Sequence, residues 1–179
     1  LFGDERCVPP DPQDSNFNMA QASLFHPLAI PPSHIFRMKG EGEDPSPVAR
    51  EYEQTIRRLT ETQPPAMPRI DLVLLGLGDD GHTASLFPGT SALQETKKIV
   101  TVGQAPTGIR SRLTLTLGVL NQAAMVLFLV TGAGDNLFLG EHSVSGDFEV
   151  IVDVYDSLGE LFESFSDSAF WRHCGLSIL

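Results

Sequence analysis

The feature of the sequence that most constrains the fold is a nearly unbroken apolar run at residues 70–77, in which Asp71 is the one charged residue. An apolar run of this length that ends in glycine predicts a strand buried on both faces, as in a parallel sheet. Three glycines, two carboxylates and an imidazole follow closely: Gly76, Gly78, Gly81, Asp79, Asp80 and His82. Open α/β sheets bind ligands beyond the carboxyl ends of their strands. The sequence therefore predicts a proton-transfer residue, His82, where such a fold usually carries its chemistry.

The spacing of the three glycines also matches the dinucleotide-binding fingerprint. That fingerprint needs a helix whose N-terminus faces the pyrophosphate, and an acidic residue about 20 positions further on. Here Pro88 and Gly89 stop a helix soon after the glycines, and the nearest downstream acid, Glu95, comes too early. Asp79 and Asp80 would also repel a pyrophosphate. We therefore regard a nucleotide site as the weaker interpretation.

Composition narrows the classes of partner and compartment. The 179 residues suffice for one core, and their net charge of −11 argues against nucleic acid and anionic membranes as partners. No apolar stretch approaches the roughly 20 residues of a membrane helix. Cys7 and Cys174 are too few for a disulfide framework and lack metal-ligand spacing. With no signal segment at the N-terminus, we expect a cytoplasmic protein without a metal site.

The order of predicted elements indicates an α/β fold. Helices are expected at about residues 17–24, behind N-cap candidates at 14–16, and from Pro47, with Ser46 as N-cap. The second helix would bury Val48, Tyr52, Ile56 and Leu59. Further strands are expected at residues 34–38, 99–102, 113–117 and 125–130. We predict an open, mainly parallel sheet flanked by helices, a Rossmann-like layered fold that is incomplete at the N-terminus, where Leu1–Gly3 resembles the end of a strand.

The sequence changes in character after Gly134. From Asp135 to the end it contains no lysine and a single arginine, Arg172. We therefore predict two regions: an α/β domain over residues 1–134, and a divergent, acidic and poorly packed tail over residues 135–179.

Three groups of motifs carry a resemblance to a known family. They are Asp4-Glu5-Arg6-x-Val8-Pro9 with Asp14-Ser15-Asn16, the run from Asp71 to Pro88, and Arg112-Leu-Thr-Leu-Thr116 followed by Leu120-Asn121 and residues 127–132. In this order they resemble the 6-phosphogluconolactonase family and, through it, the glucosamine-6-phosphate isomerase/deaminase superfamily. The resemblance covers about residues 1–134. Standing alone, the charged run Asp4-Glu5-Arg6 is equally typical of a solvated turn.

The resemblance implies hydrolysis of 6-phospho-D-glucono-1,5-lactone to 6-phosphogluconate in the pentose phosphate pathway, without a metal or organic cofactor. The partner would be this small sugar-phosphate lactone; the oligomeric state is left open. His82 corresponds to the catalytic histidine of the family, and we assign it as the general base that activates water. An imidazole, with an ordinary pKa near 6.5, is suited to that step.

The other expected site residues surround this base. Asp80 would orient the imidazole, and the backbone N–H groups of Gly76, Gly78 and Gly81 would approach the substrate. Arg6 and Arg112 match the positions of phosphate contacts in the family. Asp4 matches the acid that handles the substrate proton in the deaminases, and we expect it to orient the substrate here. Ser85 lacks a nucleophile elbow, so a capping or packing role is expected.

Departures from the family pattern leave an alternative open. Relatives have an N-terminal glycine-rich phosphate loop that this sequence lacks, and a lysine where this sequence has Asp135. An inactive or weakly sugar-phosphate-binding fragment is therefore the main alternative. The aminosugar-6-phosphate isomerase/deaminase activity is less favoured, because those relatives carry a glutamate five residues after the loop histidine, where this chain has Phe87.

Overall fold

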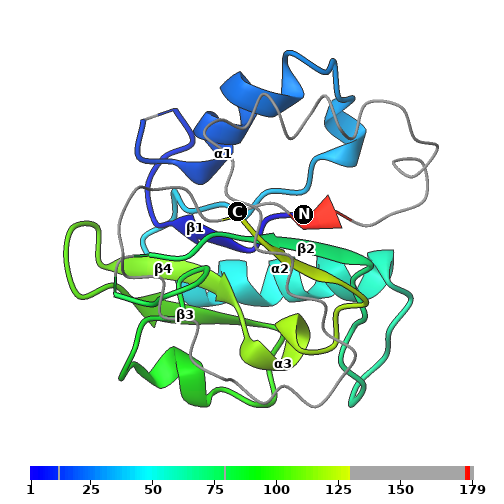
Figure 1. Cartoon of the computed structure of the whole chain (residues 1–179), viewed down its shortest axis with the longest axis vertical. Helices are drawn as coiled ribbons and strands as arrows, with labels where there is room; N and C mark the ends of the chain where they lie inside the picture. The colour runs from blue at the N-terminus through cyan, green and yellow to red at the C-terminus, as the bar shows by residue number, and fades with distance from the viewer. Residues whose placement is uncertain (12, 79, 130–175, 178–179) are drawn as a thin grey trace.

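The computed structural model describes residues 1–11, 13–78, 80–129 and 176–177, and within them the strands form two small sheets (Figure 1). The first sheet is antiparallel, in the order β1 (Asp4–Arg6), β4 (Ser111–Leu115) and β3 (Val100–Gln104). The second is parallel, in the order β5 (Val126–Phe128), β2 (Leu72–Leu75) and β6 (Leu176–Ser177). The α/β fold is confirmed, but among the described residues the strands form one antiparallel and one parallel sheet instead of a single, mainly parallel one.

The antiparallel pairing of β3 with β4 follows from the short connection between them. Strands β3 and β4 are joined by a short hairpin loop, closed where the Ala105 N–H donates to the carbonyl of Arg110. A parallel connection needs a crossover of a dozen or more residues, and this interval is too short for one. Gly108, with φ of +65°, supplies the left-handed turn residue that such a loop favours. The charged run, for which a solvated turn was an equal alternative, is itself strand β1, and both Asp4 and Glu5 are buried in it.

Strand β2 lies within the apolar run, as predicted, and occupies the centre of the parallel sheet. Val73 is fully buried and pairs with Val126 of β5. The carboxyl end of β2 leads directly into the loop that carries His82. The predicted tail over residues 135–179 lies outside the described residues apart from β6.

The helices form near the predicted positions. Helix α1 (Asn16–Ala20) begins at the N-cap Ser15, whose Oγ accepts from the Asn18 N–H at 3.2 Å, and continues as the π-helix η1 (Gln21–Phe25). Helix α2 (Pro45–Leu59) begins two residues before the prediction, because Asp44 is its N-cap. Asp44-Pro45 and Ser46-Pro47 both fit the cap-and-proline pattern, so the sequence alone could not separate them.

Helix α2 covers the antiparallel sheet, where it contacts β3 and β4 (Figure 1). Its buried face consists of Ala49, Tyr52 and Ile56, whereas Leu59 is 42% exposed, against the prediction. Residues 34–38 do not form the expected strand. The 3-10 helix η2 (Pro32–His34) precedes an extended segment without ladder pairing. Two further short helices, η3 (Ser91–Gln94) and α3 (Leu117–Leu120), flank β3 and β4 in the sequence.

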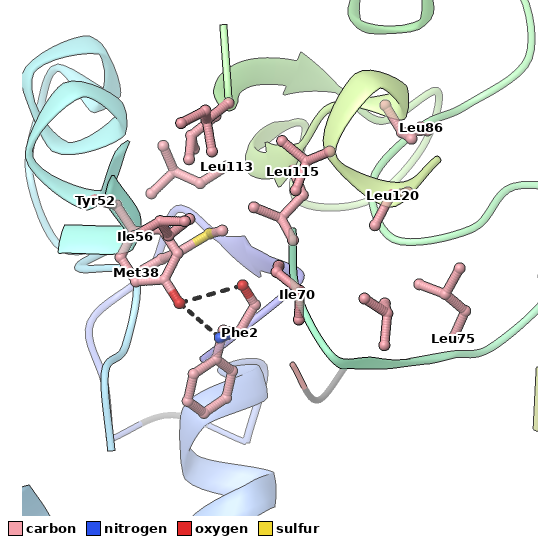
Figure 2. Packing of buried hydrophobic residues seen from close by; sticks show 14 of the residues in the cluster. Phe2, Met38, Tyr52, Ile56, Ile70, Leu75, Leu86, Leu113, Leu115 and Leu120 are labelled. Carbon is pink, nitrogen blue, oxygen red and sulfur yellow. Dashed lines mark hydrogen bonds between the residues drawn. The ribbon is translucent and has the colours of Figure 1, made fainter. Parts of the chain in front are cut away.

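The hydroxyl group of Tyr52 connects three chain segments inside the core, and Figure 2 shows its contact with one of them, at Phe2. The hydroxyl oxygen accepts a hydrogen bond from the Phe2 N–H at 2.6 Å. The hydroxyl can donate to the carbonyl oxygen of Phe36, at 2.9 Å, or to that of Phe2, at 3.2 Å. Burial raises the pKa of Tyr52, which keeps the hydroxyl protonated as the donor. Through this group α2 holds the segment that leads into β1.

We expect Tyr52→Phe to lower the free energy of unfolding by about 1–3 kcal/mol, because it leaves buried backbone groups without a partner. Urea denaturation followed by circular dichroism measures this change. Ser23→Ala is the matched control, since it removes an exposed hydroxyl that bonds only the Met19 carbonyl. Equal stability of the two variants would show that the Tyr52 hydroxyl has no anchoring role.

Candidate active site

The two arginines predicted to bind phosphate lie opposite each other on adjacent strands. In the β1–β4 ladder Arg6 pairs with Arg112, and Asp4 pairs with Thr114. Side chains two residues apart on a strand share a face of the sheet, so Asp4, Arg6 and Arg112 project to one side. All three line a cavity of about 340 Å³, together with Asp80 and His82 of the loop after β2. The structure thus brings five of the predicted site residues into one cavity.

Asp80 holds the imidazole of His82 in place. Its Oδ1 lies 2.5 Å from His82 Nδ1 and also accepts from the His82 backbone N–H at 3.1 Å. The hydrogen bond from His82 is the main cause that lowers the pKa of Asp80. An ionised carboxylate only accepts hydrogen bonds, so Nδ1 carries the proton. In the neutral ring the other nitrogen, Nε2, therefore has the free lone pair that a proton acceptor needs.

Packing fixes the imidazole from two further sides. The buried ring of Phe87 stacks against it, with 4.2 Å between ring centroids and an interplanar angle of 29°. A Cβ atom built on Gly78 would overlap the Nδ1 and Cε1 atoms of the ring. The absence of a side chain at Gly78 therefore makes room for the imidazole. The His82 side chain remains 30% exposed, which leaves it accessible to water.

The loop glycines do not line the cavity, in contrast to the five charged or ionisable residues. The Gly78 N–H donates to the carbonyl of His82, and the Gly81 N–H donates to the carbonyl of Gly78. Both groups are thus engaged inside the loop, and the Gly76 carbonyl accepts from the Thr83 hydroxyl. No helix follows this loop before η3, so the helix that a dinucleotide site requires is missing from the described residues.

Ser85 attaches the loop to the antiparallel sheet. Its hydroxyl donates to Asp4 Oδ2 at 2.5 Å, and its backbone N–H donates to the Thr114 hydroxyl oxygen at 3.2 Å. A Cβ on Gly103 of β3 would come within 3.1 Å of the Ser85 carbonyl oxygen, so the loop also packs closely over that strand. These contacts agree with a packing role for Ser85 and fix how His82 lies relative to the arginines.

The carboxylate of Asp4 is buried and lines the cavity. Its Oδ1 accepts from Asn16 Nδ2 at 2.9 Å. Burial is the largest influence and raises the pKa of Asp4, while the hydrogen bond from Ser85 and the charges of Arg112 and Arg6 act in the opposite direction. Asp4 can therefore serve as a fixed polar group that faces the cavity.

The two arginines have few partners for their charge. Arg6 Nη1 donates to the Asp14 carbonyl at 2.8 Å and to Asn16 Oδ1 at 3.3 Å. The Nε of Arg112 is buried without a hydrogen-bond partner, and no ion pair in the described part of the chain includes either arginine. Burial, and next the charge of Arg6, lower the pKa of Arg112, yet a guanidinium stays protonated at neutral pH. Like charges directly opposite each other destabilise a sheet, so this pair favours an anionic ligand.

Sequence reasoning missed two residues of this region, Glu5 and Asn16. Glu5 lies on the opposite face of β1, and its carboxylate accepts four hydrogen bonds at the start of α1. The donors are the N–H groups of Arg6, Asn16 and Phe17 and the Ser15 hydroxyl. Asn16 lines the cavity and touches both Asp4 and Arg6. Both residues lie in motifs that carried the family resemblance, but Asp14-Ser15-Asn16 was otherwise interpreted as a helix cap, and neither Glu5 nor Asn16 was assigned to the site.

The described residues contain no group of three or more His, Cys, Asp or Glu side chains arranged to hold a metal ion. None of the helices among them is long and apolar enough to cross a membrane. The ionisable groups that line the cavity are an oriented imidazole, two carboxylates and two guanidinium groups.

Comparison with known proteins assigns the family. The model of the glucosamine-6-phosphate isomerases/6-phosphogluconolactonase family matches residues 1–144. The chain belongs to this family, and within it to the 6-phosphogluconolactonases. It is 42% identical over 141 residues to the 6-phosphogluconolactonase of Synechocystis sp., a match that covers 79% of this chain and 58% of the relative.

Two further comparisons agree with this assignment. The match to 6-phosphogluconolactonase 3, chloroplastic, of Arabidopsis thaliana has 36% identity and covers 73% of this chain and 42% of the relative. The solved structure of 6-phosphogluconolactonase from Trypanosoma cruzi superposes with a TM-score of 0.66 at 37% identity, over 74% of this chain and 55% of that one. The chain thus spans about half the length of the curated relatives it matches. Because one relative is named as chloroplastic, a cytoplasmic location stays a prediction.

We expect Gly78→Ala to displace the His82 ring from Asp80, since the added methyl group would occupy the position of the imidazole. NMR spectra of the wild-type protein should contain a resonance from the hydrogen-bonded Nδ1–H of His82, and the variant should lose it. Gly76→Ala is the matched control, because a Cβ there meets nothing within 4 Å. Retention of the resonance in Gly78→Ala would contradict this account of the loop.

Proposed function

We propose that the chain hydrolyses 6-phospho-D-glucono-1,5-lactone to 6-phosphogluconate, with His82 as general base and Arg6 and Arg112 as contacts to the substrate phosphate. The support is the family assignment together with one observation: an oriented imidazole shares a cavity with two guanidinium groups that have no ion-pair partner among the described residues. The imidazole suits proton transfer from water, and the guanidinium groups suit a phosphate.

The proposed reaction needs one base and no cofactor. His82 Nε2 takes a proton from water while the water oxygen forms a bond to the lactone carbonyl carbon, whose oxygen becomes an oxyanion. When this intermediate collapses, the bond from the carbonyl carbon to the ring oxygen breaks. The imidazolium returns its proton to the leaving ring oxygen, which gives the hydroxyl group and the carboxylic acid of the product.

Asp80 contributes to both halves of this cycle. Its carboxylate keeps Nδ1 protonated and stabilises the imidazolium that forms after the first proton transfer. It is half exposed, so solvent screens this interaction and its effect is smaller than that of a buried carboxylate. We propose that Asp4 orients a sugar hydroxyl from its fixed position in the cavity lining, and that Gly78 shapes the loop.

We expect His82→Ala to lower the rate of enzymatic lactone hydrolysis by about 10²–10⁴-fold, the usual contribution of a positioned base. The measurement is a coupled assay of 6-phosphogluconate formation from freshly prepared lactone, corrected for spontaneous hydrolysis. His34→Ala, which removes an exposed histidine that does not line the cavity, serves as control. A small loss in His82→Ala would assign the base to another residue.

The same assay decides between enzyme and fragment. The alternative is an inactive or weakly sugar-phosphate-binding fragment, and this chain spans about half the length of its curated relatives. If the wild-type chain and His82→Ala both hydrolyse the lactone at the spontaneous rate, the proposed activity is overturned for this chain.

We expect Arg112→Ala to weaken binding of 6-phosphogluconate by about 1.5–3 kcal/mol, the range for a hydrogen bond to a charged group, and to change gluconate binding much less. Isothermal titration calorimetry with both ligands measures the difference. Arg110→Ala removes the same charge from an exposed position two residues away and is the matched control. Equal losses for the two ligands would show that Arg112 does not contact the phosphate.

A further inference from the structure

We infer that Asn16 is a positioning residue that separates Asp4 from Arg6, and thereby keeps the charge of Arg6 available to a phosphate group. The inference rests on the proposed function, since it assigns Arg6 to the phosphate. It adds a role for a residue that does not itself have to touch the reacting atoms.

The strand geometry creates the need for a separator. Asp4 and Arg6 are two residues apart on β1, so their side chains project from the same face of the sheet. A buried carboxylate beside a long, flexible guanidinium would be expected to form an ion pair. Among the described residues no such pair exists between them. The amide group of Asn16 is bound to both instead.

The amide group of Asn16 offers a donor to Asp4 and an acceptor to Arg6. Asn16 Nδ2 donates to Asp4 Oδ1 at 2.9 Å and to the Asp4 carbonyl at 3.3 Å, and Asn16 Oδ1 accepts from Arg6 Nη1 at 3.3 Å. A neutral amide can satisfy a carboxylate and a guanidinium at once without cancelling the charge of either. The remaining N–H groups of Arg6 are then left for an anion in the cavity.

The backbone of Asn16 is held from the other side of the strand. Its N–H donates to Glu5 Oε1 at 2.7 Å, and the Ser15 hydroxyl donates to Glu5 Oε2 at 3.1 Å. Asn16 is the first residue of α1, so the buried Glu5 carboxylate fixes both the helix start and the origin of the Asn16 side chain. This anchoring explains how a residue at a helix terminus can act as a rigid spacer.

The test compares Asn16→Ala, Asp4→Asn and the double variant by calorimetric titration with 6-phosphogluconate and with gluconate. In Asn16→Ala we expect Arg6 to pair with Asp4, so that the affinity for 6-phosphogluconate falls about tenfold, as for the loss of one charge-assisted contact, while the affinity for gluconate changes little. In the double variant the carboxylate is gone, and the affinity should return to that of Asp4→Asn. Such a recovery would not follow from a merely structural role of Asn16.

Two further variants keep the test decisive. Asn16→Asp has the same shape but places a carboxylate on Arg6, so it should also lose affinity for 6-phosphogluconate. Asn18→Ala, on the same helix but outside the cavity lining, should bind both ligands like the wild type. Equal loss of both ligands in Asn16→Ala, no recovery in the double variant, or wild-type affinity in Asn16→Asp would each overturn the inference.

The binding measurements on these variants and the assay of the proposed activity can give independent outcomes. If the wild-type chain binds 6-phosphogluconate more tightly than gluconate but does not hydrolyse the lactone, only the activity is overturned, and the variants still decide the role of Asn16. If the wild-type chain binds both ligands equally, Arg6 has no phosphate to bind, and the inference is overturned as well.

Discussion

The site depends on the antiparallel pairing of β1 with β4. This register places Arg6 directly opposite Arg112, and it turns Glu5 to the other face, where the start of α1 covers it. A shift of the register by one residue would exchange the two faces. Arg6 would then lie under the helix, and the Glu5 carboxylate would enter the cavity in its place. A three-residue strand thus sets the sign of the charge that a ligand meets.

Burial of acidic groups is the main electrostatic cost of this arrangement. Asp4 and Glu5 are both buried, and an ionised carboxylate is stable away from water only when hydrogen bonds or opposite charges compensate it. Glu5 receives four hydrogen bonds, while Asp4 receives those of Ser85 and Asn16. The compensation comes mainly from neutral donors, so the positive charges of the arginines are not consumed by it.

Much of the fold could be predicted from local patterns, and the errors have physical causes. The buried strand β2, helix α2 and the strands β3 to β5 follow from apolar runs and helical periodicity. The antiparallel pairing of β3 with β4 was not predicted, because the turn between Gln104 and Ser111 was not recognised as a hairpin. Strand β1 was not predicted at Asp4–Arg6, since three charged residues are untypical of a buried strand and their partners are distant in the sequence.

In the candidate site, too, local motifs could be predicted from the sequence, whereas contacts between distant segments could not. The motif around His82 indicated the imidazole and its carboxylate, because Asp80 and His82 are neighbours on one loop. The family resemblance indicated Arg6, Arg112 and Asp4, which the structure brings to the same cavity, although their roles stay proposals. Asn16 and Glu5 could not be predicted as part of this region, because their contacts arise only when α1 docks on β1. The loop glycines were expected near a substrate, yet two of their N–H groups bond within the loop.

The hydrogen bond from Ser85 to Asp4 joins residues 81 positions apart in the sequence. Contacts of such long separation form only after much of the intervening chain has been ordered, since closing a long loop costs entropy. The cavity therefore exists only where β1 and the loop after β2 are docked on each other. A change that separates the two would alter the cavity while it leaves the helices and strands, and hence the far-ultraviolet circular dichroism, largely intact. An intact cavity is consequently a stricter criterion of correct folding for this protein than its secondary-structure content.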